Sequence, residues 1–165
     1  MTDSSRARVL AVDWSGARRK IWLAEVAGGR MTRLESGRTR GEITEHLVEE
    51  ARRDPRLVVG LDFAFSFPAW FCQELGAQDG PAVWRAVAER GEEWLAECDD
   101  PFWGRPGRTR PELEAHFRET ETQASTRLGS QPKSVFQIGG AGAVGTGSIR
   151  GMPHLLRLRE GGFHV

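Results

Sequence analysis

Two apolar runs in this chain each end on an aspartate, at Asp13 and at Asp62. An unbroken apolar run of this length is typical of a strand that is buried in a parallel sheet. An aspartate at the end of such a run lies at the carboxyl edge of the sheet, where open α/β sheets bind their ligands. If the two strands are neighbours, the carboxylates converge and repel each other. The pattern therefore predicts a site for a hard divalent cation, which prefers oxygen ligands.

The composition is that of an ordinary globular protein. The chain has 165 residues, of which 39% are hydrophobic and 28% are charged, enough for one domain with its own core. Lys plus Arg and Asp plus Glu each number 23, so the formal net charge is zero. Global charge therefore neither favours nor excludes nucleic acid as a partner. We expect a single domain over residues 1–165.

The cysteines and the apolar segments indicate a cytoplasmic protein that does not enter membranes. Cys72 and Cys98 form no C-x-x-C pair, and they are expected to be reduced. The longest apolar stretch, around 57–71, contains Asp62 and Pro68 and cannot span a bilayer. No secretory signal is present in the sequence, because the first apolar run is too short.

The first part of the chain predicts an antiparallel meander. Strands are expected over 8–13, 21–26 and 31–35. Gly28 and Gly29 stand between the second and third strands, where a hairpin turn needs residues that tolerate positive φ.

A helix and a fourth strand follow the meander. Thr39 and Glu42 have the spacing of a capping box, and apolar residues follow at helical spacing. These are Ile43, Leu47, Val48 and Ala51. Asp54 precedes a proline and ends the helix, and 57–62 forms the next strand. A strand that returns through a helix is expected to lie parallel to its neighbour in the same sheet.

The rest of the chain is predicted to be mainly helical. Helices are expected over about 81–98, from a second capping box at Thr109 through Glu121, and over 153–160. The turn at 100–108 carries two aromatic residues and is expected to be pinned to the body. Residues 163–165 look like the start of a fifth strand that is cut short, so we expect a chain that is truncated at its C-terminus.

Five motifs carry a resemblance to a known family over nearly the whole chain: Val12–Gly16, Gly60–Pro68, Pro132–Gln137, Gly140–Gly145 and Gly151–Leu155. It is similar to domain-of-unknown-function family 429, whose members are described as predicted nucleases with an RNase H-like fold. The resemblance implies an α/β fold with a five-stranded mixed sheet, in which the first and fourth strands are adjacent.

The resemblance also implies which residues hold the metal. Asp13 and Asp62 would be catalytic ligands of one or two Mg²⁺ or Mn²⁺ ions, which activate water and stabilise the leaving oxygen of a phosphodiester. A further carboxylate is expected from a segment after the fifth strand, which this sequence does not contain. Glu121 is the one candidate inside the chain that could replace it.

Five further residues are candidates for substrate binding. Ser15 and Gly16 follow Asp13, where a tight turn could approach a phosphate. Lys133, one of two lysines in the chain, could contact a phosphate as a mobile point charge, next to Ser134. Arg118 could also contact substrate. An ordinary turn, a solvated loop lysine and a solvated helix face explain the same residues in structural terms.

Other features leave their role open. The glycine-rich run at 139–148 could cradle a phosphate with its amides or could allow tight packing against the sheet. Trp14 and Trp103 could stack on bases or pack in the core. The four histidines, His46, His116, His154 and His164, have no metal-ligand spacing.

Three functions follow from these observations. The first is a metal-dependent nuclease of RNase H-like type, with nucleic acid as its substrate. The second is an ATP-binding phosphotransferase of the actin-like or sugar-kinase type, in which Asp13, Gly16 and the glycine run would hold ATP and Mg²⁺. The third is a non-catalytic fragment that needs a partner chain to supply the missing last strand.

Overall fold

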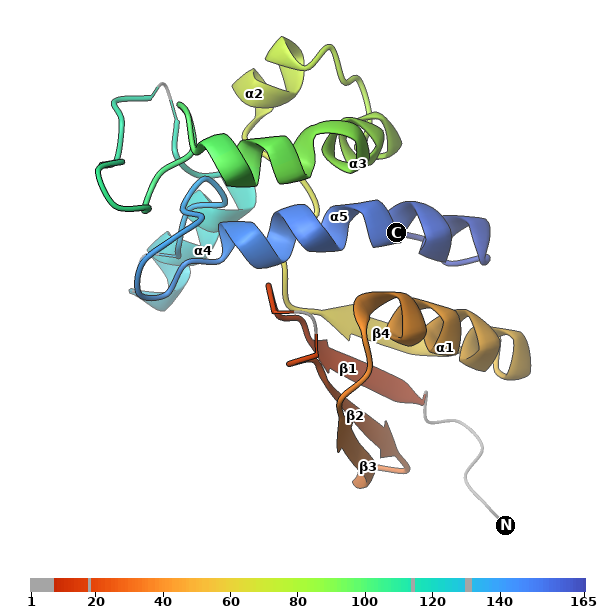
Figure 1. The fold of residues 1–165 in the computed structure, drawn as a ribbon. Helices are drawn as coiled ribbons and strands as arrows, with labels where there is room; N and C mark the ends of the chain where they lie inside the picture. Colours follow the sequence, from red (N-terminus) through yellow and green to blue (C-terminus); the bar gives the residue numbers. More distant parts are fainter. Residues whose placement is uncertain (1–7, 18, 114, 130–131) are drawn as a thin grey trace. The chain divides into compact units, whose positions relative to one another are not determined.

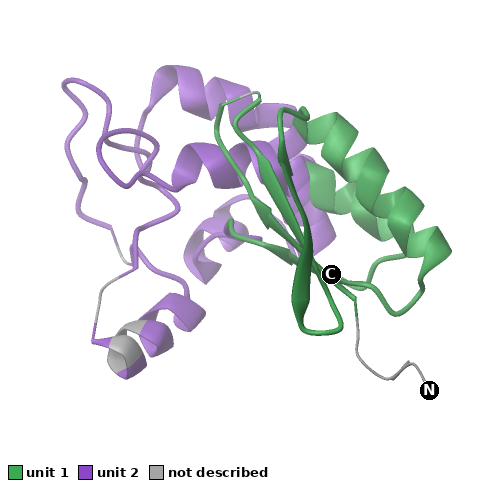
Figure 2. Cartoon of the chain, turned by 90° about the horizontal axis from the view of Figure 1, so that it is seen from below, with its two compact units in different colours: residues 1–63, 154–165 green, residues 64–153 purple. Residues whose placement is uncertain are grey.

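The computed structural model describes residues 8–17, 19–113, 115–129 and 132–165 (Figure 1). These residues form a mixed α/β structure with a four-stranded sheet, in the order β3-β2-β1-β4, and five helices. The chain divides into two compact units (Figure 2), unit 1 with residues 1–63 and 154–165 and unit 2 with residues 64–153. The predicted α/β class is confirmed, as is the order of three antiparallel strands, a helix and a parallel strand.

The sheet lies wholly in unit 1. Strands β1 (Val9–Asp13), β2 (Trp22–Ala27) and β3 (Arg30–Ser36) form the antiparallel meander. Strand β4 (Val58–Leu61) pairs in parallel with β1. Each strand therefore lies within one or two residues of its predicted position.

Helix α1 (Arg40–Arg53) carries the chain from β3 back to β4. The predicted capping box is present, since the Thr39 Oγ1 accepts from the Glu42 N–H at 3.3 Å and the Glu42 Oε2 accepts from the Thr39 N–H at 2.6 Å. This reciprocal pair satisfies two of the N–H groups that a helix start leaves without partners.

One face of the sheet carries the core of unit 1. Leu10, Val12 and Leu23 are at most 2% exposed. Helix α1 and residues 154–160 both lie on one side of the strands (Figure 2). The Thr44 Oγ1 and the His154 Nδ1 are 2.8 Å apart, which joins these two helical segments. None of the helices in the described ranges is long and apolar enough to cross a membrane.

Unit 2 contains α2 (Ala69–Glu74), α3 (Gly80–Glu97), α4 (Glu119–Leu128) and the first part of α5 (Gly145–Glu160). The prediction of a helix over 81–98 is confirmed within one residue. The sequence signal for its start is Asp79, whose Oδ1 accepts from the Ala82 N–H at 2.8 Å.

A cluster of aromatic rings forms the core of unit 2. Its rings pack mostly edge to face, with centroids 5.0–6.3 Å apart, which is the favourable range for such pairs. The cluster pins the 100–108 turn as expected, and the backbone of Trp103 exchanges hydrogen bonds with Phe136 O and Ile138 N. The rings belong to Phe67, Phe71, Trp94, Phe102 and Phe136.

The prediction of a helix beginning at Thr109 is wrong. The described residues from Thr109 to Arg118 are not helical, and α4 begins at Glu119. Two side chains bind the backbone of this segment, because the Trp70 indole donates to Ala115 O at 2.8 Å and the Ser134 hydroxyl donates to His116 O at 2.8 Å. These carbonyls would accept intrahelical bonds in a helix, so tertiary contacts prevail over the capping signal.

The prediction of a strand at 163–165 is also wrong, because these residues have no regular structure. The Phe163 N–H donates to Leu158 O at 3.1 Å and closes the end of α5, with Gly162 at a φ of +99°. This arrangement is a helix C-cap, so the first residue of the expected strand serves the preceding helix. The helix itself starts at Gly145, eight residues before the predicted start, and includes Pro153.

Gly145, in the glycine-rich run, packs closely against the backbone of Val135 and Gln137. A Cβ atom at this position would lie 2.7 Å from Gln137 O and would also meet Val135 O. At this residue the glycine allows close approach of two backbone segments, as the packing interpretation of the run expects.

We expect Gly145→Ala to lower the free energy of unfolding by about 2 kcal/mol or more, because rigid backbone atoms leave no room for the methyl group. Gly41→Ala is the matched control, since its Cβ would meet no atom within 4 Å and alanine is favoured in a helix by up to about 1 kcal/mol. Urea unfolding measures both variants. Equal stability of the two would contradict this account of Gly145.

Candidate functional site

The structure brings Asp13 and Asp62 together at one edge of the sheet. Val12 is opposite Leu61 in the parallel pair of β1 and β4, so the two aspartates are the next residues along adjacent strands. Both lie at the carboxyl ends of these strands, within unit 1. This is the arrangement that the sequence pattern predicts for these two carboxylates.

The Asp62 carboxyl accepts a hydrogen bond from the Trp14 backbone and is repelled by the Asp13 carboxylate. The Trp14 N–H donates to Asp62 Oδ1 at 2.6 Å. Partial burial of the carboxyl raises the pKa of Asp62, the Trp14 N–H opposes that rise, and the neighbouring Asp13 carboxylate adds to it. The Asp13 carboxylate therefore opposes the ionisation of Asp62, and a bound cation would relieve this repulsion.

Ring contacts hold the Trp14 side chain. Its ring centroid lies 5.1 Å from that of Phe63 and 5.3 Å from that of His154. Trp14 is only 6% exposed, and its indole Nε1 has no hydrogen-bond partner among the residues that the structure describes. Packing thus fixes the residue whose backbone N–H holds Asp62.

A hydrogen-bond chain fixes His154 in turn. The Thr44 hydroxyl donates to Arg40 O at 2.8 Å and lies 2.8 Å from His154 Nδ1. Because a hydroxyl has one hydrogen, the His154 Nδ1–H is the donor to Thr44. Burial, with some help from Arg157 and Arg40, lowers the pKa of His154 to about 4, so the ring is neutral at pH 7.

The turn after Asp13 is also held at its other end. The Arg40 Nη2 donates to Gly16 O at 2.7 Å. The Ser15 Oγ accepts from the Ala17 N–H at 3.0 Å. Helix α1 therefore fixes Gly16 directly, and Ser15 and Gly16 follow the carboxylate in an ordered turn.

Sequence reasoning missed Arg40, Thr44 and His154 as residues that hold this turn. His154 lies within the Gly151–Leu155 motif, so the sequence did contain a signal that pointed to this segment. Arg40 and Thr44 lie one turn apart at the start of α1. Nothing in the sequence shows that this first turn faces residues 14–16, because that depends on how the helix packs.

The other predicted site residues belong to unit 2. Ser134 is buried, and its hydroxyl donates to His116 O and accepts from the Phe136 N–H. Lys133 is exposed, and its aliphatic chain lies beside Gly142 of the glycine run.

Arg118 and Glu121 bind each other. The Arg118 Nη2 donates to Glu121 Oε1 at 2.8 Å, and the Arg118 N–H donates to Glu121 Oε2 at 2.9 Å. The Glu121 carboxylate thereby caps the start of α4. Both of its oxygens have structural partners within unit 2.

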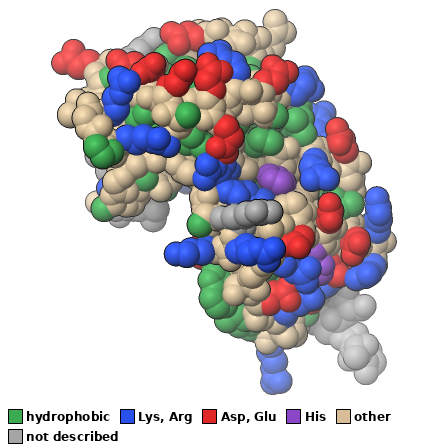
Figure 3. All heavy atoms as spheres, viewed as in Figure 1, with side chains coloured by type: hydrophobic (Ala, Val, Ile, Leu, Met, Phe, Trp, Pro, Cys, Tyr) green, Lys and Arg blue, Asp and Glu red, His purple; other side chains and the backbone are tan. Residues whose placement is uncertain are grey.

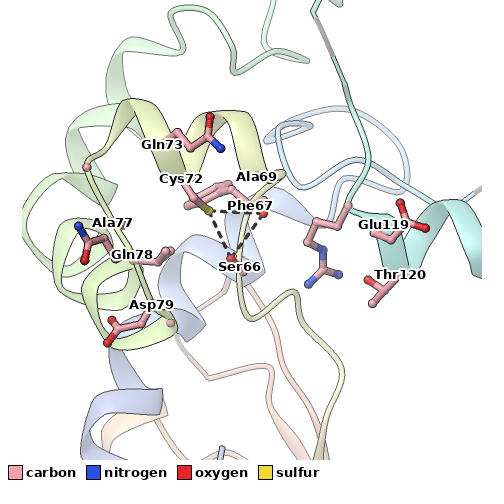
Figure 4. A pocket seen from close by; sticks show the side chains of 14 residues that line it. Ser66, Phe67, Ala69, Cys72, Gln73, Ala77, Gln78, Asp79, Glu119 and Thr120 are labelled. Atoms are coloured by element: carbon pink, nitrogen blue, oxygen red, sulfur yellow. Dashed lines mark hydrogen bonds between the residues drawn. The ribbon is translucent and has the colours of Figure 1, made fainter.

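Unit 2 has an open pocket of about 920 Å³ (Figure 4). Arg118 and Asp79 contribute to its lining. The Cys72 thiol lies 3.5 Å from Ser66 Oγ and donates to Phe67 O at 3.6 Å, as the dashed lines in Figure 4 show. No motif in the sequence predicts this pocket.

The donors at the strand ends suit a hard cation in type, and two carboxylates converge there. Within the described ranges, no three His, Cys, Asp or Glu side chains are grouped so that they could hold a metal ion. Asp13 and Asp62 supply carboxylate oxygens, which Mg²⁺ and Mn²⁺ prefer. Mg²⁺ commonly retains several waters and takes only one or two protein carboxylates, so a pair is a sufficient minimum.

Comparison with family models, with curated proteins and with solved structures found no match to this chain.

The raised pKa of Asp62 predicts how stability depends on pH. The folded chain holds this proton at a pH where the unfolded chain, with a pKa near 3.8, has lost it. Ionisation above that pH therefore costs folding free energy. We expect Asp62→Asn to be more stable than the wild type at pH 7, by about 0.5 kcal/mol or less because solvent screens the site.

That advantage should vanish near pH 3, where both states of the wild type are protonated. Urea unfolding at both pH values measures it, and Glu49→Gln, an exposed carboxylate on α1, is the control. An advantage of Asp62→Asn that is the same at pH 3 and pH 7 would contradict the assignment.

The hydrogen-bond chain through Thr44 predicts a separate effect. Thr44→Val removes the acceptor of His154 and should lower the free energy of unfolding by about 1–3 kcal/mol. Thr44→Ser keeps the hydroxyl and should lose less. The backbone amide resonance of Trp14 should move in Thr44→Val and stay in Thr44→Ser. An unmoved Trp14 resonance in both variants would disprove the link from Thr44 to the carboxylate site.

Proposed function

We propose that this chain is a divalent-metal-dependent nuclease whose reaction takes place at Asp13 and Asp62. The observation that carries the proposal is the convergence of these two carboxylates at adjacent strand ends, with the pKa of Asp62 raised in part by Asp13. Metal ions bound at such a site would activate water and stabilise the attacking and leaving oxygens of a phosphodiester. The resemblance to family 429 supports the same reaction class.

The arrangement of the strands supports a more specific fold within the α/β class. We propose an RNase H-like sheet, because the first and fourth strands are adjacent and parallel, as the resemblance implies. We also propose that the protein acts on nucleic acid in the cytoplasm, where Cys72 and Cys98, both free thiols, stay reduced.

Each residue at the strand ends has a defined task in this proposal. Asp13 and Asp62 hold Mg²⁺ or Mn²⁺, which when bound activates water and stabilises charge on the phosphate oxygens. The Trp14 N–H donates to Asp62 Oδ1 and helps to orient the carboxylate that holds the cation. The Ser15 hydroxyl accepts from Ala17, so its hydrogen can be donated to a phosphate oxygen.

Calorimetric titration with Mn²⁺ tests the proposal. We expect Asp13→Asn to lower Mn²⁺ affinity at least tenfold, because it removes a charged ligand from the pair. Glu49→Gln, which removes an exposed carboxylate elsewhere, should bind as the wild type does. Cleavage of single-stranded and double-stranded DNA and RNA in Mn²⁺ should fall with affinity in Asp13→Asn.

Equal Mn²⁺ affinity in all three proteins, with folding verified by circular dichroism, would overturn the metal site. Metal binding without cleavage of any nucleic acid would overturn the nuclease. A titration with ATP in the same instrument addresses the phosphotransferase alternative, which requires saturable nucleotide binding that depends on Asp13.

A further inference from the structure

The row of residues that crosses the sheet at the carboxylate site contains a tryptophan. Trp22 is directly opposite Asp13 in the antiparallel pair of β1 and β2, and Ser36 is directly opposite Trp22 on β3. Directly opposed residues point to the same side of a sheet, with Cβ atoms about 4.5–5.5 Å apart. Asp62 comes directly after β4, which pairs with the other edge of β1. The Trp22 side chain therefore lies beside the carboxylate pair, one strand away from Asp13.

Trp22 differs from the other aromatic residues in its exposure. It is 47% exposed, whereas every other Trp or Phe in the described ranges is buried or half-buried. Of the two tryptophans that the sequence offers for base stacking, Trp14 is buried and Trp103 belongs to unit 2. A Trp ring carries a large apolar area whose burial is favourable. An exposed ring next to a candidate reaction site therefore points to a ligand that covers it.

The side chains around Trp22 favour contact with a base over contact with the phosphate backbone. Phosphates of nucleic acid are held mainly by Lys and Arg, and neither is found among the strand residues that are paired on this side of the sheet. Figure 3 shows Lys and Arg interspersed with Asp and Glu over the side of the molecule in view. Besides Asp13, Trp22 and Ser36, the paired residues on this side are Val9, Ala11, Ala24, Val26, Met31, Leu34, Val58 and Gly60.

We propose that the Trp22 ring stacks on an unpaired base of a single-stranded nucleic acid, next to the phosphate that is cleaved. The inference rests on the proposed nuclease reaction, which places that phosphate at Asp13 and Asp62. Stacking on an aromatic ring strengthens binding by about five- to 100-fold per base and accepts any base, because every base has a π face. Bases inside a duplex are stacked on one another, so the ring selects single strands, loops and ends.

Fluorescence anisotropy with a short labelled oligothymidylate, whose phosphorothioate linkages resist cleavage, tests the proposal with and without Mn²⁺. We expect Trp22→Ala to weaken binding about five- to 100-fold, and Trp22→Phe, which keeps a ring, to lose less. The loss in Trp22→Ala should be the same at low and high salt, because stacking on a neutral ring releases no counterions.

Met31→Ala is the matched control for these variants. Met31 is 63% exposed and lies on the same side of the sheet, in the row of Val26 and Val9 at the opposite end of β1 from Asp13. This variant should bind the oligothymidylate as the wild type does. Because Trp22 is exposed, its variants should fold, and equal melting temperatures verify this.

An oligonucleotide with abasic sites separates stacking from other effects of the substitution. Removal of the bases should weaken binding to the wild type by about the factor that Trp22→Ala costs, and should weaken binding to Trp22→Ala little further. Equal affinity of Trp22→Ala and the wild type would overturn the proposal. An abasic loss that is the same in both proteins, or no binding of the oligothymidylate by the wild type, would also overturn it.

The stacking proposal and the nuclease proposal fail separately. Cleavage in Mn²⁺ that depends on Asp13, without single-strand binding that depends on Trp22, would overturn the stacking and leave the nuclease. Binding that depends on Trp22, without cleavage of any nucleic acid, would overturn the nuclease and retain Trp22 as a base-binding residue.

Discussion

The parallel pairing of β1 with β4 is the constraint on which the rest of unit 1 depends. It requires a crossover, which α1 supplies, and it brings together two aspartates that are 49 residues apart in the chain. It also leaves α1 on the same side of the sheet as residues 154–160. A slip of this pair by one residue would separate the carboxylates and turn Leu10 and Val12 away from the core.

The convergence of like charges has an energetic cost, which the surrounding contacts offset in part. The Trp14 N–H favours the ionised form of Asp62, whereas burial and Asp13 favour the protonated form. The turn that presents this N–H is fixed at Trp14 by His154 and at Gly16 by Arg40. Such support for an unfavourable arrangement is typical of functional sites, where local stability is exchanged for chemistry.

The sequence was informative wherever local signals and burial agree. The apolar runs, the capping box at Thr39 and the Gly28-Gly29 turn each predict their element within two residues. The local signals fail after Thr109, where the Trp70 and Ser134 side chains donate hydrogen bonds to backbone carbonyls. They also fail at 163–165, where the Phe163 N–H takes part in a helix cap. The first failure arises from contacts between residues that are distant in sequence, whereas the second arises from a local bond between Phe163 and Leu158. The part of the site that was missed also depends on distant contacts, because the fixing of Trp14 requires the packing of α1 and α5.

Alternation along β1 places the carboxylate site on the same side of the sheet as a set of exposed apolar residues. Val9 and Ala11 lie on that side, so Asp13, two residues further on, belongs to the same side and is directly opposite Trp22. The carboxylate row is therefore the charged border of an otherwise apolar surface.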